Sequence, residues 1–389
     1  MTSRAVVIGA GVSGALAARL LGRAGWSVRV FDKRGDPRTG AREGGSSGEG
    51  HSIGLGISGR AQAILAEAGL AETFSLITVP MAGRSIHDPE GAETFQPYGP
   101  RRPGRRSEAI LTPDGPIHSV RRDRLVAALV EAADALPEVT FHFQAKVLEV
   151  EPLSGAIQVL GPTGRETVLS ADVVIGADGA FSRVRRCLER AAEIEEERTE
   201  LPLEYKELAI PAAAGLRRDA HHLWPRRGLV LTALPCPDGS FVAVLFLPRA
   251  GSPGFASFDG EDAFRAFFES EFPDVAPLMP DLGRDYARNP ASPLVAVRCR
   301  RWHAGRVALA GDACHTFVPF SGQGANAAIE DAAALAESVL AHAPDWDAAF
   351  ERYARRRAPA TDAVAELSRV MTPLVLWLAG PLMAERGVE

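Results

Sequence analysis

Short runs of apolar residues, each followed by a glycine-rich turn, are the main pattern of this chain. The run at 5–8 (Ala-Val-Val-Ile) contains no polar residue and predicts a buried parallel strand. The Ala- and Leu-rich stretch 13–24 predicts a helix, and 27–31 (Ser-Val-Arg-Val-Phe) predicts the next strand. Two similar runs, 171–177 and 307–310, lie far along the chain. We therefore expect one buried sheet whose strands come from the beginning, the middle and the last quarter of the sequence.

Alternating apolar and polar positions between these runs predict a second, sheet-rich region. Residues 78–98 predict two strands around the turn 88–91, and the stretches 229–234 and 241–247 predict further strands. The polar, glycine-rich stretch 35–50 is expected to be a surface loop. The other predicted elements are a strand meander at 139–143, 146–150 and 157–160, and helices at 123–136, at 262–272 and over most of the chain after 325.

The predicted fold class is α/β, with a Rossmann-like nucleotide-binding domain, an inserted sheet-rich domain and a C-terminal helical segment. The nucleotide-binding domain is expected to be discontinuous because its strands are separated by the insertion. The predicted divisions are 1–78, 99–185 and 290–345 for the nucleotide-binding domain, 79–98 and 186–289 for the substrate domain, and 346–389 for the C-terminal segment.

A glycine fingerprint follows the first predicted strand directly. Gly9, Gly11 and Gly14 have the spacing G-x-G-x-x-G, which provides a tight turn, close approach of the backbone to a pyrophosphate, and close packing of helix on strand. The N–H groups at the helix N-terminus then attract phosphate. The alternative is a glycine-rich turn of a doubly wound sheet that holds no ligand.

An acidic residue stands where this fingerprint requires one. Asp32 ends the second predicted strand, 18 residues after Gly14, and a carboxylate there accepts hydrogen bonds from a ribose. Strand, turn, helix, strand and acid thus occur in order, which predicts dinucleotide binding. The fingerprint alone does not choose between NAD and FAD.

Composition narrows the class of protein. A chain of 389 residues with a formal charge of −6 argues against a nucleic-acid partner. The four cysteines show neither metal-ligand spacing nor a disulfide framework, and no secretory leader precedes the first strand. The apolar stretch 370–384 is too short for a membrane span and contains two prolines. We expect a cytoplasmic protein with no membrane partner and no metal site.

Three separated motifs suggest a family. They are Gly9-x-Gly11-x-x-Gly14, Asp178-Gly179-x-x-Ser182-x-x-Arg185 and Gly311-Asp312-Ala313-x-His315. In this order and at these positions they resemble the class A flavoprotein monooxygenases, the flavin-dependent aromatic hydroxylases. Within that family the stretches 80–87, 205–211 and 318–326 are similar to the kynurenine 3-monooxygenases, and 33–37 is similar to a hydroxylase of the violacein pathway.

The resemblance implies FAD as the bound cofactor and NADPH or NADH as a transient reductant. It assigns Arg84 and Tyr98 to a clamp on the substrate carboxylate, and Pro319 and Phe320 to the surroundings of the reacting ring. The residues that it implies at FAD are Gly9, Gly11, Val12, Ser13, Gly14, Asp32, Lys33, Arg34, Arg122, Asp178, Gly179, Asp312, Pro319, Gly322, Gln323, Gly324, Ala325 and Asn326.

The implied reaction is hydroxylation of a small aromatic substrate by O2 through a flavin C4a-hydroperoxide, which attacks an electron-rich ring. An amino or hydroxy group on the substrate activates that ring, so the protein need not supply a strong base, and no nucleophile–histidine–acid set is found. Kynurenine, or a related aryl amine or indole derived from tryptophan, is the expected substrate. The oligomeric state is not predicted.

Two departures keep other functions open. The family's Asn-Tyr-x-x-Glu motif is replaced here by Ser368-Arg369-Val370-Met371-Thr372, and Gly54 stands where the kynurenine enzymes carry Asn. One alternative is therefore an epoxidase or another oxidative tailoring enzyme of natural-product biosynthesis. The other is a flavin reductase or flavin-binding regulatory protein that does not oxygenate.

Overall fold

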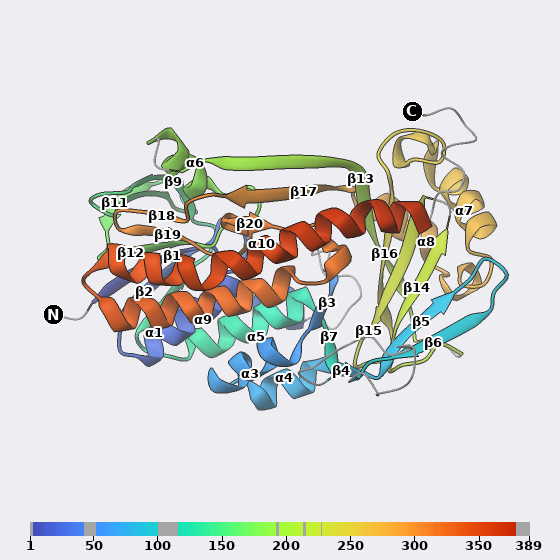
Figure 1. Ribbon diagram of the computed structural model, residues 1–389, viewed down its shortest axis with the longest axis horizontal. Helices are drawn as coiled ribbons and strands as arrows, with labels where there is room; N and C mark the ends of the chain where they lie inside the picture. The colour runs from blue at the N-terminus through green and yellow to red at the C-terminus, as the bar shows by residue number, and fades with distance from the viewer. Residues whose placement is uncertain are drawn as a thin grey trace.

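The computed structural model describes residues 3–42, 52–99, 116–191, 194–212, 215–226 and 228–378, and Figure 1 shows their arrangement. A six-stranded sheet occupies one end of the molecule. Its order is β18 (His303–Ala304), β19 (Val307–Leu309), β12 (Val173–Gly176), β1 (Arg4–Ile8), β2 (Ser27–Phe31) and β8 (Val139–His142). Helix α1 (Val12–Arg23) joins β1 to β2. The predicted strand–helix–strand unit and its distant sheet partners are confirmed.

One predicted strand belongs to a different sheet. Residues 139–143 were expected in a meander, and this is wrong, because β8 pairs in parallel with β2. Helix α5 (Arg122–Asp134) precedes β8 and packs against α1, so it acts as the crossover that delivers β8 to the sheet edge. The meander consists of β9 (Lys146–Glu151), β10 (Ala156–Leu160) and β11 (Glu166–Ser170).

An eight-stranded sheet occupies the other end. Its order is β20 (His315–Thr316), β17 (Ser292–Cys299), β13 (Glu196–Ile210), β16 (Phe241–Pro248), β15 (Leu229–Pro235), β14 (Ala220–Arg226), β5 (Gly83–His87) and β6 (Glu93–Pro97). The long strands β13 and β17 run from this sheet toward the six-stranded sheet (Figure 1). One face of the eight-stranded sheet forms a hydrophobic core with α7 (Gly260–Glu271) and α8 (Leu282–Arg288).

We call the opposite face of this sheet the site face. Because side chains alternate along a strand, Tyr205, His221, Thr232 and Val244 project to this face, as does Arg84 on β5. Its apolar members pack against a segment that follows the six-stranded sheet, since Val244 and Phe246 share a cluster with Val318. The site face therefore lies between the two large sheets.

Another three-stranded sheet, separate from the meander, links the two ends. It consists of β3 (Gly54–Ile57), β7 (Ile117–Arg121) and β4 (Thr78–Met81). The region 78–98 was predicted to hold two strands, but its first strand is interrupted at Ala82: β4 pairs with β7, whereas β5 joins the eight-stranded sheet. The turn between β5 and β6 is as predicted.

Two helices run along the molecule. Helix α9 (Gly324–His342) packs on α1, and α10 (Trp346–Leu378) packs on α9 and continues toward the eight-stranded sheet (Figure 1). Part of the predicted loop at 35–50 is helical, because α2 spans Pro37–Arg42, and 43–50 lies outside the described residues. The other helical elements are α3 (Gly59–Glu67), α4 (Ala71–Ile77), α6 (Arg183–Arg190), and the 3-10 turns η1 (Phe255–Ser257), η2 (Ala276–Leu278), η3 (Gly311–Ala313) and η4 (Pro319–Ser321).

Within the described ranges, no helix has both the length and the apolar character needed to cross a lipid bilayer. The four cysteines are buried and free.

Candidate functional site

The glycine turn after β1 has the geometry that the fingerprint predicts. Gly9 has a φ of +104°, and a Cβ placed on it would lie 2.3 Å from the carbonyl oxygen of Ala177. A Cβ on Gly14 would lie 1.9 Å from the carbonyl oxygen of Gly9. A Cβ on Gly11 would meet nothing within 4 Å. Two glycines are thus required by packing, whereas Gly11 leaves the backbone open to a ligand.

The N-terminus of α1 carries the unsatisfied groups that a phosphate needs. Its N-cap is Gly11, which has no side chain to accept from the first N–H groups. Ser13, the second residue of the helix after Val12, is buried, and among the described residues its hydroxyl has no hydrogen-bonding partner. A buried polar atom of this kind requires a partner, and a pyrophosphate oxygen provides one. Gly311 faces the same serine, since a Cβ on Gly311 would lie 3.1 Å from Ser13 Cβ.

Asp32 braces this turn from the end of β2. Its carboxylate accepts hydrogen bonds from the backbone N–H of Ala10 at 2.8 Å and from the guanidinium of Arg34 at 2.9 Å. Burial alone would raise the pKa of Asp32, but the hydrogen bonds and charge of Arg34 lower it below its usual range. The carboxylate is therefore ionised and engaged within the turn. The neighbouring Lys33 and Arg34 are exposed.

The second motif connects the turn to the third. Asp178 accepts hydrogen bonds from the hydroxyl of Ser182 and from the backbone N–H of Arg183, so its carboxylate caps α6. Gly179 has a φ of +84° and open space around its Cα. The buried Arg185 donates to Glu196 at 2.7 Å and to the carbonyl oxygen of Ala313 at 2.8 Å. The motifs near residues 9, 180 and 312 thus meet at one place.

Arg122 and Asp312 lie on the next side of the site. Arg122 is the first residue of α5, is exposed, and has its backbone N–H bonded to the carbonyl oxygen of Ile53 at 3.0 Å. Burial raises the pKa of Asp312, and the nearby charge of Arg122 offsets part of that rise. The two side chains therefore lie within electrostatic reach, although they are 190 residues apart in the sequence.

The segment after η3 forms the wall nearest to the site face. Pro319 is exposed at the start of η4, and Gly322 ends this turn with a φ of +64°. The ring of Phe320 lies 5.1 Å from that of Phe246 on the sheet. Gln323 caps α9, which begins with Gly324 and Ala325. Asn326 fixes the segment, because its amide donates to the carbonyl oxygens of Gly56 and Gly322 at 3.0 and 3.1 Å.

The predicted clamp residues lie near each other on the site face, at the edge of the sheet formed by β5 and β6. Arg84 on β5 donates through Nε to Oε1 of Gln96 on β6 at 2.8 Å. Burial raises the pKa of Tyr98, and the charge of Arg84 opposes this rise, so the phenol lies near the guanidinium and stays protonated. A guanidinium flanked by neutral donors is suited to bind a carboxylate.

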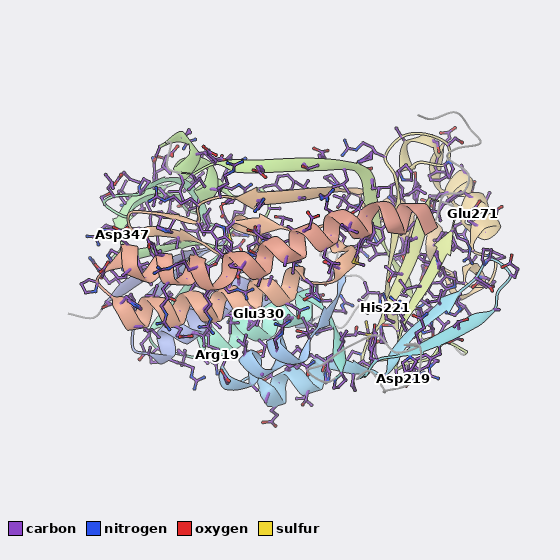
Figure 2. All side chains as sticks on the ribbon, in the orientation of Figure 1. Arg19, Asp219, His221, Glu271, Glu330 and Asp347 are labelled. Carbon is purple, nitrogen blue, oxygen red and sulfur yellow. The ribbon has the colours of Figure 1, made fainter. Side chains whose placement is uncertain are left out.

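The sequence gives two adjacent histidines, and the structure separates them. His222 is fully buried on the opposite face of the sheet, stacked on Trp224 and His87. His221 projects to the site face, where its Nε2 lies 2.5 Å from Oγ1 of Thr232. Figure 2 labels His221 on the eight-stranded sheet, far from Asp347 at the start of α10. Because successive side chains of a strand project to opposite faces, the sequence predicts that the two histidines are separated, but it does not predict which of them faces the site.

Glu207 and Tyr205 are further site-face residues that sequence reasoning missed. Both lie on β13, where Tyr205 is opposite Phe246 and Glu207 is opposite Val244. Burial raises the pKa of Glu207 to about 7, although the charge of Arg122 lowers it. The same arginine also lowers the pKa of Tyr205, which burial raises. These two side chains therefore lie on the Arg122 side of the site.

The residues at the turn fit an FAD molecule. The open backbone at Gly11 and the buried hydroxyl of Ser13 suit its pyrophosphate, and Arg122 and Asp312 suit its polar chain. The exposed Pro319 and the Gly322 turn suit the edge of the flat ring. When bound and reduced, FAD supplies the oxygen-activating chemistry.

Comparison with known proteins agrees with this assignment. The family model described as "FAD binding domain" matches residues 2–226 and 285–368. A kynurenine 3-monooxygenase of Salinispora arenicola is 40% identical over 371 residues, covering 94% of this chain and 78% of that protein. One from Myxococcus xanthus is 36% identical over 368 residues, covering 93% and 76%.

Solved structures share the fold. A 2-methyl-3-hydroxypyridine-5-carboxylic acid oxygenase matches with a TM-score of 0.78 at 22% identity, covering 98% of this chain and 94% of that one. PqsL of P. aeruginosa, in complex with 2-aminobenzoylacetate, matches with a TM-score of 0.74 at 21% identity, covering 97% of each chain. The predicted fold class and the predicted FAD cofactor are confirmed. The chain belongs to the FAD-binding-domain family, and it is an FAD-dependent monooxygenase of the aromatic-hydroxylase type.

Proposed function

We propose that the protein hydroxylates kynurenine, or a related aryl amine or indole derived from tryptophan, with O2 and with NADPH or NADH as the transient reductant. The observation that carries this proposal is the position of Arg84 beside Gln96 and Tyr98 on the site face. This group would hold the substrate carboxylate at the end of the sheet. The aromatic end would then point toward Phe246 and Phe320, next to the expected flavin ring.

The residue roles belong to the same proposal. Ser13 and the Gly9–Gly14 turn would hold the pyrophosphate of FAD, and Arg122 and Asp312 would hold its ribityl region. The division of the chain into an FAD-binding domain and a substrate domain is part of the proposal too, with the site face as the substrate side. The names of the Salinispora and Myxococcus relatives support kynurenine as the first substrate to try.

The direct test measures NADPH oxidation by the purified, FAD-loaded protein with and without L-kynurenine, and the mass of the product. We expect strong stimulation and the gain of one oxygen on the ring. Replacing Arg84 by Met should raise KM roughly 10- to 100-fold with FAD content unchanged, since losing one charged hydrogen-bonded contact costs about 1.5–3 kcal/mol. Arg300→Met, at a surface arginine that is 66% exposed, is the matched control and should leave KM unchanged.

A second function has a specific observation in its favour. Leu234 on the site face occupies the space next to Gly54. Ser368, in the last third of α10, donates a hydrogen bond to Ser321 at 3.1 Å. Both places that depart from the kynurenine enzymes therefore contact the surroundings of the site. An oxidative tailoring enzyme would give oxygen at another position or a rearranged product.

A flavoprotein that does not oxygenate would show no substrate-stimulated O2 uptake, and that outcome would contradict the proposal.

A further inference from the structure

His221 and Thr232 form a polar pair on the site face, directly beside the expected carboxylate clamp. β14 pairs in parallel with β5, and His221 is the residue in register with Arg84. Thr232 comes from β15, on the other side of β14, and its hydroxyl lies 2.5 Å from Nε2 of His221. The nearest side chains of the same face on these strands, Leu223 and Leu234, are apolar. The pair is therefore a polar spot among the apolar site-face residues of β14 and β15, next to the charged Arg84 of β5.

His222 shows what a purely structural histidine looks like in this sheet. It is fully buried, and both of its ring nitrogens are used: Nδ1 lies 2.9 Å from Nε2 of His87, and Nε2 lies 2.8 Å from the carbonyl oxygen of Arg217. His221 is only half-buried. Among the residues that the structure describes, its Nδ1 has no hydrogen-bonding partner. Both ring nitrogens of His222 are thus hydrogen-bonded within the protein, whereas His221 keeps one ring nitrogen available for a hydrogen bond on the site face.

The pair has a defined hydrogen-bonding capacity whichever tautomer forms. Burial, together with the nearby charge of Arg84, lowers the pKa of His221 to about 3, so the ring is neutral at physiological pH. If the threonine hydroxyl donates to Nε2, then Nδ1–H is left as a donor. If Nε2–H donates to the hydroxyl oxygen, then Nδ1 is left as an acceptor and the hydroxyl hydrogen as a donor. In each case an uncharged donor is available.

We propose that His221 and Thr232 determine substrate specificity by donating a hydrogen bond to a neutral oxygen of the substrate, a ketone or hydroxyl, that lies near the carboxylate held by Arg84. This inference rests on the proposed function and narrows its substrate class to aromatic oxo or hydroxy acids. Side chains in register on neighbouring strands are about 5 Å apart. That spacing suits a carbonyl placed two or three bonds along the chain from the carboxylate carbon. Arg84 would bind the carboxylate through its charge, and the uncharged pair would bind the ketone or hydroxyl oxygen through a hydrogen bond.

Binding to the FAD-loaded full-length enzyme tests this inference, read as the change in flavin absorbance. The two probes are 2-aminobenzoylpropionate and its deoxo analogue, 2-aminophenylbutanoate, which differ only in the ketone oxygen. We expect the wild-type protein to bind the keto acid about tenfold more tightly, as one satisfied hydrogen bond allows. His221→Leu combined with Thr232→Val should reduce this preference to within twofold while leaving affinity for the deoxo acid within threefold.

Single variants keep the test decisive if the double variant folds poorly. Thr232→Val removes the hydroxyl donor and His221→Leu removes the ring donor, so at least one of these single variants should lose the preference, whereas Thr232→Ser preserves the hydroxyl and should keep it. Leu223→Val, on the same face, should affect both probes equally. A preference that survives both Thr232→Val and His221→Leu, or a wild-type protein with no preference, would overturn the inference.

Parallel assays of kynurenine-dependent NADPH oxidation separate the two proposals. If kynurenine is hydroxylated but the ketone preference is absent, only the role of His221 and Thr232 is wrong. If no aryl-amine acid binds or is oxygenated, the proposed function is wrong and this inference is wrong with it.

Discussion

At the scale of single residues, burial controls which groups on the site face carry charge. It lowers the pKa of His221 and raises the pKa of Tyr98, so both are neutral at physiological pH. Glu207 differs from them, because burial raises its pKa only to about 7, with Arg122 acting in the opposite direction. At the clamp the site face therefore carries the positive charge of Arg84, and farther along the same face Glu207 is a carboxyl group that titrates in the physiological range.

The raised pKa of Glu207 predicts a pH-dependent stability. The folded state binds this proton up to about pH 7, whereas the unfolded chain releases it near the ordinary glutamate pKa of 4.5. Glu207 therefore lowers stability progressively as the pH rises through that interval. Glu207→Gln should therefore gain stability relative to the wild type between pH 5 and pH 8. We expect about 1 kcal/mol, because partial exposure reduces the effect. Urea unfolding of the wild type and of Glu207→Gln at pH 5 and pH 8 measures this gain. An equal stability difference between the two proteins at both pH values would contradict the prediction.

At the scale of elements, the local patterns are the ones that the sequence predicts well. The glycine turn and α1 follow from residues that are close in the chain, since Gly9 and Gly14 meet backbone that only a glycine can approach. The sheet membership of β8 does not follow, because it depends on the packing of α5 against α1. The surroundings of His221 do not follow from local sequence either, since β5 pairs with β14 from more than 130 residues away and brings Arg84 beside His221.

A buried carboxylate joins three elements behind the flavin site. Asp331 of α9 accepts hydrogen bonds from Nε2 of His315 at 2.5 Å, from the backbone N–H of Gly311 at 3.2 Å and from Nε of Arg357 on α10 at 2.7 Å. Burial alone would raise the pKa of Asp331, but these partners lower it, so it is ionised. Although Cys314, His315 and Asp331 lie close enough to hold a metal ion, both oxygens of Asp331 are already used in this network. Asp331 thus acts as a positioning residue for η3.

Replacing Asp331 by Asn tests that role. The change keeps the shape but removes one of the two carboxylates that pair with the buried Arg357, whose other partner is Glu330. We expect the loss of this charged hydrogen bond to lower the free energy of unfolding by about 1.5–3 kcal/mol. It should also weaken FAD binding through the backbone at Gly311. Urea unfolding and flavin release measure the two effects. Glu337→Gln on the same helix removes an exposed partner of Arg352 and should change stability by less than about 1 kcal/mol. Equal effects of the two substitutions would contradict the role of Asp331.

At the scale of the whole molecule, the site depends on how closely the linking sheet approaches the eight-stranded sheet. Gly54 on β3 lies against Leu234 on β15, and a Cβ on Gly54 would lie 2.8 Å from both Cβ and Cδ1 of that leucine. Ile53 packs beside it on the cluster that contains Val244 and Phe246. Since the backbone N–H of Arg122 bonds to the carbonyl oxygen of Ile53, the same strand positions a residue at the expected flavin. The Gly54–Leu234 contact thus links the substrate side of the site to its cofactor side.

This contact predicts that residues 54 and 234 must change together. Gly54→Asn places a side chain where Leu234 stands, and overpacking of this kind costs about 1–3 kcal/mol. The single variant should therefore be less stable and have a higher KM for L-kynurenine. Adding Leu234→Ala removes Cγ and Cδ1 of the leucine and leaves only its Cβ near residue 54. The double variant should therefore recover a coupling energy of about 0.5–3 kcal/mol, measured by urea unfolding of both single variants and the double variant. Gly161→Asn, where a Cβ meets only a carbonyl oxygen 3.6 Å away, is the control for adding Asn to a strand region. If the effects of the two substitutions simply add, β3 can move away from the sheet, and the leucine does not set the shape of the site.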